Sequence, residues 1–355
     1  MNLSAYQHVL AIETSCDDTS VAIVRADGFV VGCLIANQDL AHRPFGGVVP
    51  EIASRNHTLQ VLPLLEELFA KTHWSWQKID GISVTNRPGL IGSLLVGVVT
   101  AKSLALIYNK PFIGVNHQEA HLLAPFLWDA ASDTHGDLKS KIQFPYLALT
   151  VSGGHTHLFH VRGLGNYQLL GRTVDDAAGE ALDKFAKILG LGFPGGAKVD
   201  ELAKSGDITK FKFPRTMKDS ADLNFSFSGL KAAAVRLVET LDAKTIETQR
   251  VDLCASFQEA VIESLMVKLK AAQMQLQLNR IVITGGVCAN SRLRALAREW
   301  GEQNRNVEIF MPALKYCTDN AAMVGLVGVW RLQRGERSEQ TLSPSAASLQ
   351  NDFNL

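Results

Sequence analysis

Two histidines four residues apart, His117 and His121, stand in a stretch whose apolar residues have helical spacing. Residues four apart lie on the same face of a helix about one turn apart, so both imidazoles could bind one metal ion. The alternative is two polar residues on a solvated face, and the spacing alone does not decide. A peptidase of the HExxH type needs a glutamate directly after the first histidine, where this chain has Gln118. Glu119 comes one residue later, on another face.

A metal ion held by two histidines needs a further ligand, and Asp319 is the candidate. It lies in CTDNAAMVGLVGVW, just before an apolar helical stretch. Two imidazoles and one carboxylate leave coordination positions open, which suits a Lewis acid that orients a carbonyl group. The alternative role of Asp319 is to cap the following helix by accepting hydrogen bonds from backbone N–H groups.

The segment SGGHT at residues 152–156 follows an apolar strand. Its two glycines let backbone N–H groups approach an anion without obstruction by a Cβ atom, as in a phosphate-binding turn. Paired glycines also occur in ordinary turns. The segment ETSCDDT at residues 13–19 has the matching place after the first strand, so we expect two facing turns that frame a polyanion.

Two other glycine-containing segments could bind a nucleotide. TGGVCANSRLR at residues 284–294 runs from a strand into a helix, so a purine could lie against its backbone while Asn290 hydrogen-bonds to the nucleotide. Capping of that helix is the alternative role of Asn290. GFPGGAKVD at residues 192–200, with Asp183 on the preceding helix, offers carboxylates for ribose hydroxyls, or is an ordinary loop.

Residues 184–236 are locally basic, with ten lysines or arginines against five acids. Phe211, Phe213 and Phe225 lie among these charges, so the segment could follow a phosphate backbone and stack on RNA bases. A solvated surface is the alternative. The formal net charge of the chain is +0, so a contact with nucleic acid would have to be a local patch.

The elements that position these residues must belong to a large α/β protein. With 355 residues, the chain exceeds the size at which one hydrophobic core stops growing, so we expect two lobes. The five cysteines are scattered and never spaced as CxxC, which fits a reducing cytosol. The sequence contains neither an apolar run long enough to span a membrane nor a signal-peptide pattern at its start. We expect a soluble, cytoplasmic protein without a membrane contact.

Apolar periodicity predicts three antiparallel strands first, and then alternating helices and strands. The segment YLALTVSGGHTHLFHVR repeats the opening VLAIETSCDDTSVAIV at an offset of 137 residues, so that Leu10 corresponds to Leu147 and Thr19 to Thr156. The repeat predicts two similarly built lobes.

The expected strands cover residues 8–15, 19–26, 29–37, 79–86, 111–117 and 280–286. The expected helices cover residues 50–71, 89–108, 118–130, 176–190, 229–241 and 248–274, and a last helix follows residue 319. We expect a surface connection over residues 129–143.

Eight segments together resemble the TsaD family, the tRNA N6-adenosine threonylcarbamoyltransferases once described as O-sialoglycoprotein endopeptidases: IETSCDDT, FGGVVPEIASR, HQEAHLLAP, VSGGHT, DDAAGEALDK, FSFSGLK, TGGVCAN and CTDNAAM. The resemblance spans nearly the whole chain. It implies the α/β fold of actin, Hsp70 and the sugar kinases (ASKHA), with two duplicated lobes around a central nucleotide cleft. We expect residues 1–122 with 320–337 to form the N-terminal lobe and residues 123–319 the C-terminal lobe.

The resemblance also implies an activity. The threonylcarbamoyl group of threonylcarbamoyl-AMP is transferred to the N6 amine of the adenosine next to the anticodon, in tRNAs that read codons beginning with adenine, and AMP is released. It further implies one metal ion, iron (Fe²⁺) or zinc, on His117, His121 and Asp319. The residues implied to line the substrate pocket are Thr150, Val151, Ser152, Gly153, Gly154, Asp183, Gly196, Asp200 and Asn290.

The partners that the resemblance implies are tRNA, a smaller paralogous protein (TsaB-like), an ATPase (TsaE-like) and the enzyme that makes the adenylate. Other activities considered are a metalloendopeptidase, which Gln118 disfavours, an ATPase or kinase of the same fold, and a non-catalytic scaffold. The chain departs from the family pattern at TNRPGL, where Arg87 stands in place of a glycine. Asn116 stands where a histidine is common, and Lys198 lies within the pocket loop.

Overall fold

The computed structural model describes residues 6–131, 142–218 and 220–347. The chain forms two compact units, which we call unit 1 (residues 1–142 and 312–352) and unit 2 (residues 143–311 and 353–355). The lobe boundaries expected from the sequence, after residues 122 and 319, differ from the boundaries of the two units. The described residues that directly follow residue 122 and those that directly precede residue 319 belong to unit 1, because hydrogen bonds join them to it. Trp128 exchanges backbone hydrogen bonds with Gly28 and Val30, and the Tyr316 hydroxyl donates to Asp129.

Unit 1 is built on a five-stranded sheet in the order β3-β2-β1-β4-β5. The first three strands are antiparallel, as the opening apolar runs predict, whereas β4 runs parallel to β1 and β5 parallel to β4. The carboxyl ends of β1, β4 and β5 therefore meet at one edge, where ligands bind in open α/β sheets. The strands are β1 (His8–Glu13), β2 (Thr19–Arg25), β3 (Val30–Ala36), β4 (Gly81–Arg87) and β5 (Phe112–Asn116).

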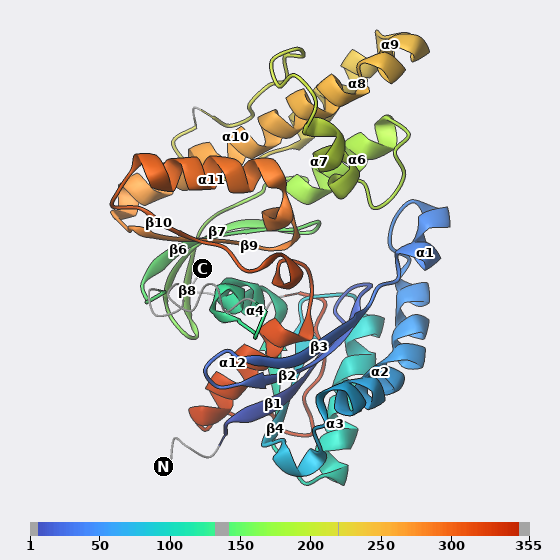
Figure 1. Cartoon of the computed structure of the whole chain (residues 1–355), viewed down its shortest axis with the longest axis vertical. Helices are drawn as coiled ribbons and strands as arrows, with labels where there is room; N and C mark the ends of the chain where they lie inside the picture. The colour runs from blue at the N-terminus through green and yellow to red at the C-terminus, as the bar shows by residue number, and fades with distance from the viewer. Residues whose placement is uncertain (1–5, 132–141, 219, 348–355) are drawn as a thin grey trace. The chain divides into compact units, whose positions relative to one another are not determined.

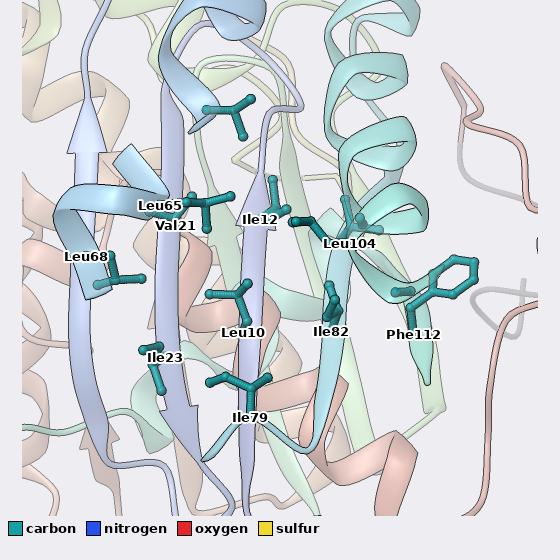
Figure 2. Packing of buried hydrophobic residues seen from close by; sticks show 14 of the residues in the cluster. Leu10, Ile12, Val21, Ile23, Leu65, Leu68, Ile79, Ile82, Leu104 and Phe112 are labelled. Atoms are coloured by element: carbon teal, nitrogen blue, oxygen red, sulfur yellow. The ribbon is translucent and has the colours of Figure 1, made fainter. Parts of the chain in front are cut away.

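Helices α2 (Pro50–Thr72) and α3 (Ile91–Ile107) cover one face of this sheet (Figure 1). Figure 2 shows the core between the sheet and these helices, in which Leu10 of β1 and Ile23 of β2 lie near Leu68 of α2. Alternate side chains of each strand point into this core, because successive side chains of a strand point to opposite faces of the sheet. The short helices α1 (Asp39–His42) and α4 (His117–Leu123) complete the first part of the unit.

Helix α12 (Ala321–Gln333) covers the other face of the same sheet and contacts β1, β2 and β4. Two glycines allow this close approach. A Cβ atom at Gly328 would lie 2.3 Å from Cβ of Ser83, and one at Gly325 would lie 2.6 Å from a methyl group of Val24. The small residues thus fix where α12 lies, and with it the residues just before its first turn.

Unit 2 repeats the plan of unit 1 with a sheet in the order β10-β9-β6-β7-β8. β6–β7–β8 are antiparallel, and β9 and β10 are added in parallel, so the duplication predicted from the 137-residue repeat is confirmed. The strands are β6 (Tyr146–Val151), β7 (Thr156–Gly163), β8 (Asn166–Arg172), β9 (Arg280–Thr284) and β10 (Glu308–Phe310), and the helices are α6 (Ala178–Ile188), α7 (Gly196–Ala203), α8 (Ser228–Glu239), α9 (Ala243–Thr248), α10 (Arg250–Leu276) and α11 (Ser291–Gln303).

Two expectations about local structure need correction. The helix expected over 118–130 ends at Leu123 and continues as a 3₁₀ turn, because Pro125 has no N–H and disfavours helical backbone in the residue before it. The segment 192–200 is a loop only in its first half, since α7 begins at Gly196. The expected connection over 129–143 lies largely outside the described residues. None of the described helices is both long and apolar enough to cross a membrane.

Candidate metal centre and nucleotide site

His117 and His121 extend from α4 toward the carboxylate of Asp319, which lies 198 residues beyond His121 in the chain. Oδ1 of Asp319 is 3.1 Å from Nε2 of His121 and 3.4 Å from Nε2 of His117. The two imidazoles are buried, while the Asp319 side chain remains 28% exposed. The cluster is therefore open at Asp319, where a substrate could reach it.

Helix caps explain why these side chains converge. Asn116, at the end of β5, caps α4 by accepting hydrogen bonds from the N–H groups of Gln118 and Glu119, so the helix begins at His117. The cap of α12 is Asn320, whose side chain accepts from the N–H of Met323. Asp319 was a candidate for that capping role, and because Asn320 takes it, the Asp319 carboxylate faces the histidines instead.

Glu13 and Ser15 orient the His117 ring. Oε2 of Glu13 lies 3.2 Å, and Oγ of Ser15 lies 3.1 Å, from Nδ1 of His117. Glu13 is fully buried and also accepts hydrogen bonds from the Ser15 backbone and the Thr85 hydroxyl. A carboxylate that accepts from Nδ1–H leaves the lone pair of a neutral imidazole on Nε2, which is the nitrogen aimed at Asp319. This role of Glu13 is not predicted from the sequence, although a glutamate at the end of an apolar strand is a visible signal.

The groups of the cluster shift one another's pKa values. Burial lowers the pKa of His117, but Asp319 and Glu13 outweigh it and hold that pKa well above its ordinary value. Burial raises the pKa of Asp319, but His117 and His121 hold it well below its ordinary value. The pKa of His121 is lowered, chiefly by burial. A cation bound here would replace the proton on Nε2 of His117, so its binding would release a proton.

The donor set fits a transition metal ion. The three ligand atoms lie within 4.8 Å of one another. Tetrahedral ligands at about 2.0–2.2 Å from zinc are separated by roughly 3.3–3.6 Å, so small side-chain adjustments suffice. Two imidazoles and one carboxylate suit zinc, and they also form the facial triad of non-haem iron. Among the described residues, this is the one group of three such side chains close enough for a shared ion.

In unit 2, the turn after β6 has the features of an anion-binding loop. The N–H of Ser152 donates to the carbonyl of His155, and the N–H of His155 donates to Oγ of Ser152, which closes the turn. Within the described residues, neither Gly153 nor Gly154 donates a backbone hydrogen bond, and a Cβ atom at either would meet nothing within 4 Å. Both N–H groups are therefore available to a ligand.

The other expected pocket residues are brought together in unit 2 by hydrogen bonds. Oδ1 of Asp183 accepts from the N–H groups of Gly195 and Gly196, at 2.9 and 2.8 Å. Asp200 accepts from the N–H and hydroxyl of Ser291. The carboxylates thus order the starts of α7 and α11.

Thr150 and Val151 end β6 beside the start of the glycine segment at Gly285, where a Cβ atom would lie 2.4 Å from the carbonyl of Val151. Asn290 caps α11 and donates from Nδ2 to Gln258 at 2.7 Å, so its capping role is observed.

The basic segment differs from the expectation. Phe213 and Phe225 are buried, and Phe213 packs edge-on against Phe185 and Phe257, so neither ring is presented to RNA. The apolar core of unit 2 takes these aromatic rings. Several of the cations are paired with acids, including Lys210 with Asp252. Further ion pairs among the described residues of the segment involve Lys184, Lys204, Arg215 and Lys231.

Solved structures of known proteins share this fold. Component A of (R)-2-hydroxyglutaryl-CoA dehydratase from Acidaminococcus fermentans matches with a TM-score of 0.52 and 15% identity, over 92% of this chain and 98% of that chain. HypF from T. kodakarensis matches with a TM-score of 0.60 and 12% identity, over 94% of this chain and 48% of that chain. These matches and the duplicated sheets define a protein of the ASKHA class.

A family model described as TsaD, tRNA N6-adenosine threonylcarbamoyltransferase, matches residues 29–326. A tRNA N6-adenosine threonylcarbamoyltransferase of Bdellovibrio bacteriovorus is 52% identical over 347 residues, which cover 98% of this chain and 99% of the relative. The chain belongs to the TsaD family.

Proposed function

We propose that this protein is a tRNA N6-adenosine threonylcarbamoyltransferase that uses threonylcarbamoyl-AMP as the donor and acts on the adenosine next to the anticodon. The full-length similarity to a relative of that name carries the proposal. The His117, His121 and Asp319 cluster supports it, since an acyl transfer benefits from a Lewis acid beside the carbonyl. We place the reaction in the cytoplasm, and the five cysteines, all present as thiols, agree with a reducing compartment.

In the proposed reaction, His117, His121 and Asp319 would hold a divalent ion such as Fe²⁺ or zinc, which would supply a Lewis acid for the carbonyl of the threonylcarbamoyl group. Glu13 keeps the His117 ring in place. The N–H groups of Gly153 and Gly154 bind the phosphate and stabilise the charge that develops as AMP leaves. Thr150, Val151 and Ser152 form the strand end and turn that present these donors. No covalent intermediate on the protein is required, so positioning and electrostatics supply the catalysis.

The remaining pocket residues have proposed roles at the nucleoside end. Asp183, Gly196 and Asp200 line the ribose, and Asn290 lies at the base. Asn290 keeps one N–H of its amide beyond the bond to Gln258, because the amide nitrogen has two hydrogens. The nucleoside is therefore held mainly by ordered backbone, and the capping contacts of these side chains are part of how the pocket is built.

A metalloendopeptidase is disfavoured by a contact in the structure. The only acid within the HQEAH segment is Glu119, and both of its oxygens are bonded to Arg331, at 2.9 and 2.8 Å. A peptidase glutamate must instead activate a water molecule beside the metal ion.

We also propose that the protein works with partners, namely a smaller TsaB-like paralogue and a TsaE-like ATPase. An apolar stripe on unit 1 supports a protein partner. Ile91, Leu95 and Val99 follow one another at four-residue spacing on α3, and each is at least half exposed. Leu59 and Leu62 of the adjacent α2 are also exposed. Contiguous exposed apolar side chains of this kind mark interaction sites.

The function is tested by depleting the protein in its own cell and measuring tRNA nucleosides by mass spectrometry. We expect threonylcarbamoyladenosine to disappear and to return with the wild-type gene, but not with the Asp319→Ala variant. Unchanged threonylcarbamoyladenosine after depletion would refute the proposed function. Restoration by Asp319→Ala would refute the metal requirement alone.

A further inference from the structure

The helix that carries both histidine ligands is short and needs an anchor. α4 has seven residues, all of them buried, and it runs directly into a 3₁₀ turn. A single helix of two turns has little stability of its own. The directions of His117 and His121 therefore depend on contacts that fix how α4 is rotated about its axis.

Glu119 supplies such a contact from the far side of the helix. It follows His117 by two residues, which corresponds to a rotation of roughly 200° away from the face of the two ligands. Its side chain is 2% exposed, and its two carboxylate oxygens accept from Nη2 of Arg331 at 2.9 and 2.8 Å. Nη1 of Arg331 donates in turn to Glu336 at 2.8 Å, so the guanidinium is itself held.

Arg331 belongs to α12, the helix that directly follows Asp319. The ion pair thus joins the element that carries two ligands to the element that places the third, across 212 residues of sequence. We infer that Glu119 and Arg331 are positioning residues that preorganise the metal cluster by locking the rotation of α4 against α12. This inference rests on the proposed metal site.

The chain contains a matched control pair. In unit 2, Nε and Nη2 of Arg292 donate to the two oxygens of Glu259 at 2.5 and 2.7 Å. The Glu259 side chain is 5% exposed and that of Arg292 is 28% exposed, against 2% and 24% for Glu119 and Arg331. Loss of either pair leaves a buried group without its counter-charge, so both should lower thermal stability. Only the first pair should alter metal binding.

The test measures Co²⁺ binding to the purified full-length chain by equilibrium dialysis and by the visible absorption of bound Co²⁺. We expect Glu119→Gln and Arg331→Met each to weaken Co²⁺ binding about tenfold or more, which is the size seen for residues that orient metal ligands. The double variant should bind no more weakly than the worse single one, because the two residues act as a unit. Glu259→Gln should bind like the wild type.

A second measurement uses the metal-free chain. Backbone amide hydrogen exchange of residues 117–123 should be faster in Glu119→Gln than in Glu259→Gln. If Glu119→Gln does not fold, Arg331→Lys replaces it in the test. Lys keeps the charge but loses the planar guanidinium that joins Glu119 to Glu336, so we expect an intermediate loss of Co²⁺ affinity. Wild-type Co²⁺ affinity in the Glu119 and Arg331 variants, or equal losses in the Glu259 control, would overturn the inference alone. A wild-type chain that binds no Co²⁺ would overturn the proposed metal site as well.

Discussion

At the scale of single residues, burial decides which groups carry charge. Glu13 and Asp319 hold the pKa of His117 high, so buried charges are tolerated where each has a counter-charge. His157 on β7 lacks one. Burial, reinforced by Arg172, lowers the pKa of His157 to about 4. Within the described residues, its buried Nδ1 also has no hydrogen-bond partner. His157 is therefore neutral in the folded protein at physiological pH.

This difference predicts a pH dependence of stability. The unfolded chain takes up a proton on His157 near its ordinary pKa of 6.5, whereas the folded chain does so near 4. The unfolded state binds more protons than the folded state between these pH values. The contribution of neutral His157 to the unfolding free energy is therefore complete above pH 6.5 and is lost as the pH falls toward 4. It amounts to at most about 3 kcal/mol. Urea unfolding at a series of pH values should show a shallower decline for His157→Leu, and an unchanged decline would contradict the assignment.

At the scale of elements, caps at two helix starts build the metal cluster. Asn116 begins α4 at the first ligand, and Asn320 begins α12 directly after the third. The glycines of α12 then let that helix lie close to the sheet. The ligands are consequently placed by backbone elements with fixed ends, which gives more precise positions than flexible loops would.

Removal of one cap should therefore affect metal binding more than stability. Asn320→Ala loses the hydrogen bond from the N–H of Met323 and the one that its own Nδ2 donates to the carbonyl of Thr318, so it should cost about 1–2 kcal/mol of unfolding free energy. It also frees Asp319 to turn toward the helix N-terminus, so we expect weaker Co²⁺ binding. Asp242→Ala removes a comparable cap from α9, where the side chain accepts from the N–H of Thr245 at 2.8 Å. If both variants bind Co²⁺ equally well, the cap has no role in placing the ligand.

At the scale of the whole molecule, duplication has produced two units with different chemistry. The end of β1 and the turn after it contribute Glu13 and Ser15 to the cluster in unit 1. The corresponding turn after β6 in unit 2 instead presents the N–H groups of Gly153 and Gly154. The same strand–turn–strand unit thus supports a proposed cation-binding role in one copy and a proposed anion-binding role in the other.

The two roles should be separable by mutation. Gly154→Val places a branched side chain where the phosphate must approach, so we expect calorimetry to show a large loss of affinity for a non-hydrolysable adenylate analogue with normal metal content. A Cβ atom at Gly154 meets nothing within 4 Å, so the fold should tolerate the change. Gly163 is equally open, and Gly163→Val in the same unit is the control. Wild-type affinity in Gly154→Val would show that the phosphate binds elsewhere.

Much of this protein could be predicted from local sequence. The spacing of His117 and His121 determined that they share a helix face, and the repeated strand–turn–strand pattern determined that two similar sheets form. These features depend on the helical and strand periods, which operate over a few residues. Local pattern also limited Asp319 to a metal ligand or a helix cap, and Asn290 to a nucleotide contact or a helix cap. It did not choose between these roles.

Only the tertiary structure decided which residues cap these two helices. Asn320 takes the cap and leaves Asp319 for the histidines, whereas Asn290 is itself a cap. The hydrogen bonds from His117 to Glu13 and from Arg331 to Glu119 join residues 104 and 212 positions apart. Such contacts depend on the order of the strands and on how closely α12 packs against its sheet. The helical and strand periods of the sequence determine neither of these. The burial of Phe213 has the same cause, because a core is filled by residues from distant segments.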